Sequence, residues 1–243
     1  MMWIAPRKAL WAVLSTMTAL SVTASATAAS ISTAVETFLS RSANLTAEGT
    51  IDWMQFGGYP VAGFGSSVSA EKLGGADLSV VFSQADGVTN VSATSSSWTD
   101  GDPALVVGPH DSGWRFTGRT VIPRGISIDA QADTTDRLLQ LFVGTEDGVT
   151  GELRATVFDV SNTPISTEVV ANLGPNSDAV YKLTFNGDNP GDYVRVNWSL
   201  SAISPSVSSS RAAYISAVTL AVPEPTLATL VTPFALLARR QRR

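Results

Sequence analysis

The protein has 243 residues, of which 44% are hydrophobic and 15% are charged; the charged share lies well below the usual value of about 25%. It has no cysteine and one histidine, which excludes a disulfide framework, thiol chemistry and a histidine-rich or cysteine-rich zinc site. Six of the 16 basic residues and one of the 21 acidic residues lie in residues 1–28 and 222–243, so the body between them carries a net charge of −10. Such a surface repels nucleic acid and anionic lipid.

Residues 1–28 are expected to form a signal peptide. Arg7 and Lys8 give a basic start, residues 9–20 (ALWAVLSTMTAL) form an apolar stretch, and residues 25–28 (SATA) supply small residues for cleavage after Ala28. The apolar stretch is too short for a stop-transfer helix. The alternative interpretation is a buried N-terminal helix.

Residues 29–221 are expected to form an all-β domain. The first part is ambiguous, because the apolar residues of 30–43 could form one short helical face without a convincing cap. Beyond it the hydrophobic period is two: Val194, Val196 and Trp198 alternate with polar residues, and residues 153–157, 181–185 and 214–221 follow the same pattern or are more apolar. About ten short strands separated by Gly, Asp, Asn and Pro turns predict an antiparallel two-sheet β-sandwich with jelly-roll-like connectivity.

Three stretches of this body resemble a secreted bacterial β-sandwich module. They are residues 44–53 (NLTAEGTIDW), residues 97–103 (SWTDGDP), and residues 139–144 with 151–155 (LQLFVG and GELRA). The resemblance spans nearly the whole body. It implies an extracellular β-sandwich that in other proteins stands beside carbohydrate-active domains, and it implies no activity of its own.

The candidate catalytic residues do not form a recognisable set. His110 lies in a Gly/Pro loop beside Asp111 and Ser112, but no G-x-S-x-G elbow is present and neighbours along a chain do not point at one another. Two aspartate pairs could be the two carboxyls of a glycosidase, but turn formation explains them equally; they are Asp100 with Asp102 and Asp133 with Asp136. We therefore expect no enzymatic activity and no catalytic residue, with a glycoside-acting enzyme as the remote alternative.

No cofactor is expected. Residues 100–102 (DGD) or 146–148 (EDG) could offer oxygen ligands to a structural Ca²⁺ ion in a turn. The sequence has no complete EF-hand loop, so a plain surface turn is the competing interpretation, and no metal site is assigned.

Three tryptophans near turn signals are the candidates for carbohydrate contact: Trp53, Trp98 and Trp114. A tryptophan offers a flat apolar face with a polar edge, on which a sugar ring could stack while an aspartate accepts from hydroxyl groups. The alternative is that these side chains fill the core of the sandwich, as we expect for Trp198 from its phase with Val194 and Val196.

Residues 222–243 (VPEPTLATLVTPFALLARRQRR) are expected to be a sorting tail. Pro223 and Pro225 fix an extended step around Glu224 that no strand or helix absorbs. Residues 226–238 are apolar but too few to span a bilayer. A basic cluster follows, which would hold that side in the cytoplasm; it consists of Arg239, Arg240, Arg242 and Arg243.

The order of these parts resembles a PEP-CTERM protein. Signal peptide, β domain, Pro223-Glu224-Pro225, apolar segment and arginines occur in the order of that class. The resemblance implies recognition by an inner-membrane exosortase, transient inner-membrane association through both termini, and a place in exopolysaccharide or biofilm matrix. The apolar segment is shorter than usual for the class and contains Pro233.

These observations lead to one main hypothesis and two alternatives. The main hypothesis is an exported, exosortase-sorted protein of the cell surface or extracellular matrix, structural or adhesive and associated with exopolysaccharide. The first alternative is a carbohydrate-binding module on the same fold, with extracellular polysaccharide as partner. The second is the glycoside-acting enzyme, which no catalytic set supports.

Overall fold

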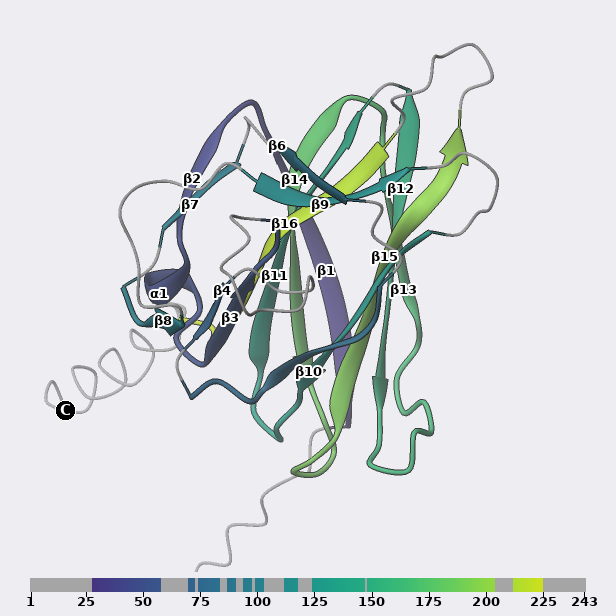
Figure 1. Cartoon of the computed structure of the whole chain (residues 1–243). Coiled ribbons are helices and arrows are strands. Elements are labelled where there is room, and N and C mark those ends of the chain that lie inside the picture. Colours follow the sequence, from purple (N-terminus) through teal and green to yellow (C-terminus); the bar gives the residue numbers. More distant parts are fainter. Residues whose placement is uncertain are drawn as a thin grey trace, which may run out of the picture.

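A computed structural model describes residues 28–57, 70–72, 74–83, 87–90, 94–97, 99–102, 112–117, 124–146, 148–203 and 212–224. Within these ranges the chain forms two main antiparallel sheets that pack face to face as a sandwich (Figure 1). The prediction of an all-β, two-sheet antiparallel sandwich is therefore confirmed. No helix in the described ranges is long and apolar enough to cross a membrane.

The larger sheet has nine strands. Its main path runs in the order β1 (Ser30–Phe38), β14 (Ser177–Asn186), β11 (Arg137–Glu146), β16 (Ala212–Ala221), β3 (Asp52–Gln55), β4 (Ala70–Lys72) and β8 (Gly101–Asp102). Strand β9 (Ser112–Thr117) also pairs with β16, and β6 (Gly87–Asn90) pairs with β9.

The smaller sheet has five strands in the order β13 (Val169–Leu173), β12 (Val149–Phe158), β15 (Tyr193–Ile203), β10 (Gly125–Gln131) and β5 (Leu78–Ser83). A separate parallel pair joins β2 (Arg41–Asn44) to β7 (Thr94–Ser97). The four-residue helix α1 (Leu45–Glu48) follows β2 directly.

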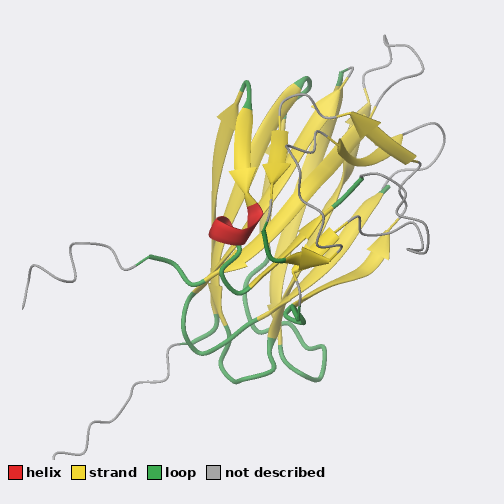
Figure 2. Ribbon diagram, turned by 60° about the vertical axis from the view of Figure 1, so that its left-hand side comes forward, coloured by secondary structure: helices red, strands yellow, loops and turns green. Residues whose placement is uncertain are grey.

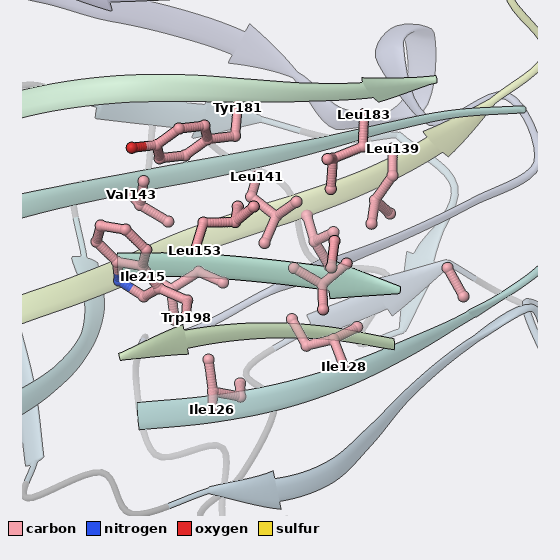
Figure 3. Close-up of a cluster of buried hydrophobic side chains, with 14 of the residues drawn as sticks. Ile126, Ile128, Leu139, Leu141, Val143, Leu153, Tyr181, Leu183, Trp198 and Ile215 are labelled. Carbon is pink, nitrogen blue, oxygen red and sulfur yellow. The ribbon is translucent and has the colours of Figure 1, made fainter. Parts of the chain in front are cut away.

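The core lies between the two sheets and follows from the two-residue period of the strands. On β15, Val194, Val196 and Trp198 are buried and the residues between them are partly exposed. Residues such as Ile126 and Leu153 of the smaller sheet face Leu141 and other apolar side chains of the larger one (Figure 3). Trp198 is fully buried and its indole Nε1 donates a 3.0 Å hydrogen bond to the carbonyl oxygen of Tyr214, so its expected core role is confirmed.

The ambiguous stretch 30–43 forms strands rather than a helix. Residues Ser30–Phe38 pair in continuous register with β14, from Ser30 opposite Asn186 to Phe38 opposite Asp178. Their β-branched residues favour a strand, and a helical face without a cap has little intrinsic stability. The helix begins only after Asn44, whose side-chain oxygen accepts a hydrogen bond from the Ala47 backbone N–H at 3.2 Å, as N-cap residues do.

A second apolar cluster covers the outer face of the nine-stranded sheet. Phe142, Val180 and Ala217 project from this face and pack with Trp53 and with residues of β2 and α1. Helix α1 lies against the strands on this side (Figure 2) and contacts β16 and β3. The nine-stranded sheet is therefore buried on both faces where α1 and β2 lie over it.

A buried carboxylate links the two sheets at one end of the sandwich. Asp52 of β3 is 2% exposed and accepts backbone hydrogen bonds from Trp53 at 2.8 Å, from Asp77 at 3.0 Å and from Leu78 at 2.9 Å. Since β3 belongs to the larger sheet and β5 begins at Leu78 in the smaller one, this side chain fixes the start of β5 against β3. Burial raises the pKa of Asp52, while the three N–H donors act to lower it.

Candidate functional site

The outer face of the five-stranded sheet is polar. Among the described residues, no apolar cluster covers it. Alternation along β10, β12 and β15 turns ten side chains outward, and we call this set the polar face: Ser127, Asp129, Glu152, Arg154, Thr156, Phe158, Tyr193, Arg195, Asn197 and Ser199. Ser127 is buried and the rest are partly or largely exposed. The same two-residue period that builds the core thus builds this surface.

Cross-strand pairing arranges the polar face in rows. Asn197 of β15 lies opposite Ser127 on one side and Arg154 on the other. In the next row, Ser199 lies opposite Gly125 and Glu152. Residues in such rows have Cβ atoms about 4.5–5.5 Å apart, so side chains distant in sequence share one small surface.

A hollow of about 250 Å³ opens on these two rows. Its lining combines a carboxylate, a guanidinium, an amide and two hydroxyl groups, together with parts of the apolar residues beneath; it consists of Gly125, Ile126, Ser127, Glu152, Arg154, Asn197, Trp198 and Ser199. Pockets for drug-sized ligands have volumes of about 300–1,000 Å³. The hollow is therefore sized for one small polar unit and not for a large enclosed ligand.

Gly125, which lines the hollow, allows β10 and β15 to approach closely. A Cβ atom on Gly125 would lie 2.0 Å from the carbonyl oxygen of Trp198 and 2.7 Å from the Cα of Ser199. Such distances are far below van der Waals contact, so β10 and β15 approach each other here only because residue 125 is glycine.

Ion pairs hold the charged residues of the hollow in place. The Arg154 Nε donates to Glu152 at 2.6 Å, and its Nη1 donates to Glu168 at 3.1 Å. The hydrogen bond to Glu152 raises the pKa of Arg154. Deeper in the hollow, the Ser127 hydroxyl donates to the Asn197 side-chain oxygen. These contacts orient polar groups toward solvent before any ligand arrives.

An aromatic and arginine cluster lies on the same face, with Arg195 two residues and Tyr193 four residues along β15 from Asn197. Phe158 and Tyr193 stack with ring centroids 5.6 Å apart, and the Arg195 guanidinium carbon lies 5.5 Å and 5.3 Å from their two centroids. Two 2.8 Å hydrogen bonds join Arg195 to Asp129. Because β-strands rise about 3.3 Å per residue, Arg195 lies about 7 Å and Tyr193 about 13 Å from Asn197 along the strand.

The two candidate tryptophans among the described residues, Trp53 and Trp114, lie elsewhere. Trp53 is 0% exposed in the cluster beneath α1, and Trp114 is 4% exposed with its ring 5.0 Å from that of Phe56. Neither ring presents a face to solvent. Both side chains are buried, as the alternative interpretation from the sequence expects. Trp98 lies outside the described residues.

Two of the candidate carboxylates, Asp100 and Asp133, serve as local hydrogen-bond acceptors. Asp100 accepts from the Thr46 hydroxyl at 2.6 Å and from the Trp53 indole at 3.0 Å. Burial raises the pKa of Asp100, but these two hydrogen bonds and the Lys72 ammonium outweigh it and hold the pKa below its ordinary value. Asp133 accepts from the Thr134 backbone N–H at 2.7 Å, as aspartates in turns do.

The remaining candidates fall partly outside the described residues. In the described ranges, no group of three His, Asp or Glu side chains could hold a metal ion; Asp147 lies outside these ranges. Pro223 and Glu224 follow β16 without regular secondary structure. Two parts of the predicted sites are not described, the single histidine (His110) and the rest of the tail motif with its arginines (Pro225, Arg239, Arg240, Arg242 and Arg243).

Comparison with known proteins gives no family. No family description and no curated protein matches the sequence. Three of the solved structures that match share 9–14% identity with this chain. A module titled "Family 16 Carbohydrate Binding Module-2" matches with 14% identity, a TM-score of 0.30, and coverage of 46% of this chain and 77% of its own.

Two further matches are of the same kind. A family 61 carbohydrate-binding module (TmCBM61), solved with β-1,4-galactotriose, matches with 9% identity and a TM-score of 0.34 over 60% of this chain and 88% of its own. The enzymatically active domain of tailspike protein 4 of bacteriophage CBA120 matches with 11% identity and a TM-score of 0.35 over 47% of this chain and 16% of its own. All three are distant structural similarities.

Proposed function

We propose that this protein is a carbohydrate-binding β-sandwich that holds a neutral polysaccharide on the polar face of its five-stranded sheet. The observation that carries the proposal is the hollow bordered by Gly125, in which Glu152, Arg154, Asn197 and Ser199 converge on one small volume. The proposal rests on these residues and not on the distant structural similarities.

The lining has the chemistry that a sugar requires. Each sugar hydroxyl donates and accepts a hydrogen bond, and the hollow offers carboxylate acceptors, guanidinium donors, and amide and hydroxyl groups that do both. The existing ion pair between Glu152 and Arg154 reduces the side-chain entropy lost on binding. The stacked Phe158 and Tyr193 rings add apolar surface at the far end of the same face, which a longer chain of sugars could reach.

The charge of the polar face favours a neutral glycan. Arg154 pairs with Glu152 and Glu168, and Arg195 pairs with Asp129. The two guanidinium groups are thus matched by three carboxylates, so the face offers no excess positive charge to a polyanion. The net charge of −10 on residues 29–221 opposes polyanions further.

The test compares binding of the purified protein to neutral xylan, galactan and β-glucan with binding to anionic alginate. In the variant Ser199→Phe, the larger side chain should fill the hollow from its rim. We expect the variant to bind its neutral polysaccharide at least tenfold more weakly in isothermal titration, with an unchanged unfolding temperature.

Thr184→Phe is the matched control. Thr184 is also half-buried, but it lies on β14 in the nine-stranded sheet, so the same enlargement there should leave binding unchanged. Equal binding by wild type and Ser199→Phe, or binding to alginate alone, would contradict the proposal.

Export, sorting and the absence of turnover are proposed on the sequence alone. The segments in 1–28 and 222–243 support an exported protein that an exosortase sorts to the cell surface or matrix, where glycan binding would retain it. Mass spectrometry of the native protein should find cleavage after Ala28, and the bound polysaccharide should release no reducing ends. Recovery of uncleaved protein from the cytosol would refute export.

A further inference from the structure

We propose that β1 pairs with the β1 strand of a second copy of this chain, in an antiparallel dimer whose two-fold axis passes at Thr33. This dimer would join two nine-stranded sheets into one continuous sheet. The inference concerns a surface distant from the hollow and does not depend on the proposed function.

Strand β1 is an open sheet edge. In the described part of the chain, its sole partner within the sheet is β14, and the nine paired residues continue without a bulge. It is longer than the other described edge strands, which have two to six residues. An edge strand presents a row of unpaired backbone N–H and C=O groups, and proteins usually protect it with bulges, proline or charge. Strand β1 (SISTAVETF) has no bulge, no proline and one charged residue.

That single charge is neutralised within the same copy. Glu36 lies 2.7 Å from the Lys182 ammonium and 3.6 Å from the Arg41 guanidinium, and the Lys182 hydrogen bond holds the pKa of Glu36 below its ordinary value. The Glu36 carboxylate therefore pairs with cations of β14 and β2, and it does not protect the open edge with an unpaired charge. Seven of the nine β1 residues are exposed, so most of this strand is accessible to a second strand.

The sequence of β1 is self-complementary about Thr33. In an antiparallel pair the two opposed residues are both hydrogen-bonded or both not, so a symmetric dimer must have one residue opposite its own copy. With Thr33 at that position, Ile31 lies opposite Val35 twice. Val35 is 53% exposed in one copy, and this register gives it an apolar neighbour on the same face.

Two other registers are less favourable. Centring on Ala34 places both Ile31 and Val35 opposite threonines, and centring on Glu36 places two carboxylates face to face, which is destabilising. Centring on Thr33 places Glu36 opposite Ser30 and keeps its ion pairs intact. The apolar and polar residues of β1 therefore match those of a second β1 strand, so we infer that the partner at this edge is a second copy of the chain.

The absence of cysteine gives a direct test by disulfide trapping in the full-length protein. Opposed residues in an antiparallel pair have Cα atoms about 4.5–5.5 Å apart, within the range that a disulfide bridges. Thr33→Cys should therefore form a covalent dimer under mild oxidation. In Thr37→Cys, the matched control on the same exposed face, the two cysteines would lie eight residues apart, about 27 Å, and should stay monomeric.

A second experiment uses charge. Thr33→Lys and Thr33→Glu each place like charges at the axis, so analytical ultracentrifugation should find each variant monomeric while wild type dimerises reversibly with rising concentration. An equimolar mixture of the two should form the dimer again. A wild type that stays monomeric at its solubility limit, or equal trapping of Thr33→Cys and Thr37→Cys, would overturn the proposal.

Discussion

The two sheets of the sandwich differ in what lies on their outer faces. The nine-stranded sheet carries Phe142, Val180 and Ala217 outward, and β2 and α1 bury them together with Trp53. The five-stranded sheet carries Glu152, Arg154 and Asn197 outward and leaves them partly exposed. The nine-stranded sheet is thus covered on its outer face by β2 and α1, whereas the outer face of the five-stranded sheet is part of the protein surface. The comparison indicates that residues outside the sandwich core serve stability on the first face and are left accessible to solvent on the second.

The largest expected effect is on the covered face. Trp53→Ala should lower the free energy of unfolding by about 3–5 kcal/mol, because it removes a large buried side chain and leaves a cavity. The change also deprives Asp100 of the 3.0 Å hydrogen bond from the indole. Urea unfolding followed by circular dichroism measures this loss. A loss below about 1 kcal/mol would show that α1 and β2 add little to stability.

A smaller effect concerns a carboxyl of the same face, Asp178 of β14. Burial, with the nearby Glu146 carboxylate, raises the pKa of Asp178 from 3.8 to about 6. The folded state then binds the proton more tightly than the unfolded state, so this contribution to stability is complete below about pH 4 and is lost as the pH rises to about 6. Since Asp178 is only half-buried, solvent screening reduces the change to on the order of 1 kcal/mol.

Asp178→Asn provides the control for this pH dependence. The amide does not titrate, so the variant should lose the fall in stability between about pH 4 and pH 6 that wild type shows. Urea unfolding at several pH values measures both curves. Parallel curves for the two proteins would mean that Asp178 ionises normally in the folded state.

The smallest effect on stability is expected on the polar face. Arg154→Ala removes a side chain that is 47% exposed and paired only with exposed or partly exposed glutamates, so unfolding in urea should be unchanged within error. Polysaccharide binding should nonetheless fall, because the hollow loses its guanidinium donors. Lys182→Ala, which breaks an exposed ion pair with Glu36, should change neither property. If Arg154→Ala lowers the free energy of unfolding, residues of the polar face also contribute to stability, and the proposed difference between the two faces is wrong.

Much of the fold could be predicted from local pattern. Alternation over residues 153–157, 181–185 and 194–200 predicts β12, β14 and β15, and it also places Trp198 in the core. Residues 30–43 stayed ambiguous, because the pairing with β14 that makes Ser30–Phe38 a strand involves residues about 150 positions away. Sequence pattern detects the period of a segment, and tertiary pairing decides between weak alternatives.

The candidate site was less predictable than the fold. Its signal was present, since Arg195, Asn197 and Ser199 occupy the outward positions of a strand that the sequence analysis identified. Nothing local shows that Glu152 and Gly125 lie beside Ser199, because that proximity comes from sheet order and register. A tryptophan can be identified in the sequence as a candidate for carbohydrate contact by itself. The hollow, in contrast, is formed by residues of three strands, β10, β12 and β15.

Gly125 limits how this surface could diversify. Any side chain at that position would collide with the backbone of β15, at the carbonyl oxygen of Trp198. Residue 125 therefore cannot carry a side chain unless β10 and β15 separate. Under the proposed function, relatives of this chain that bind different sugars should keep glycine at the equivalent of residue 125 and vary at the equivalents of Glu152, Asn197 and Ser199.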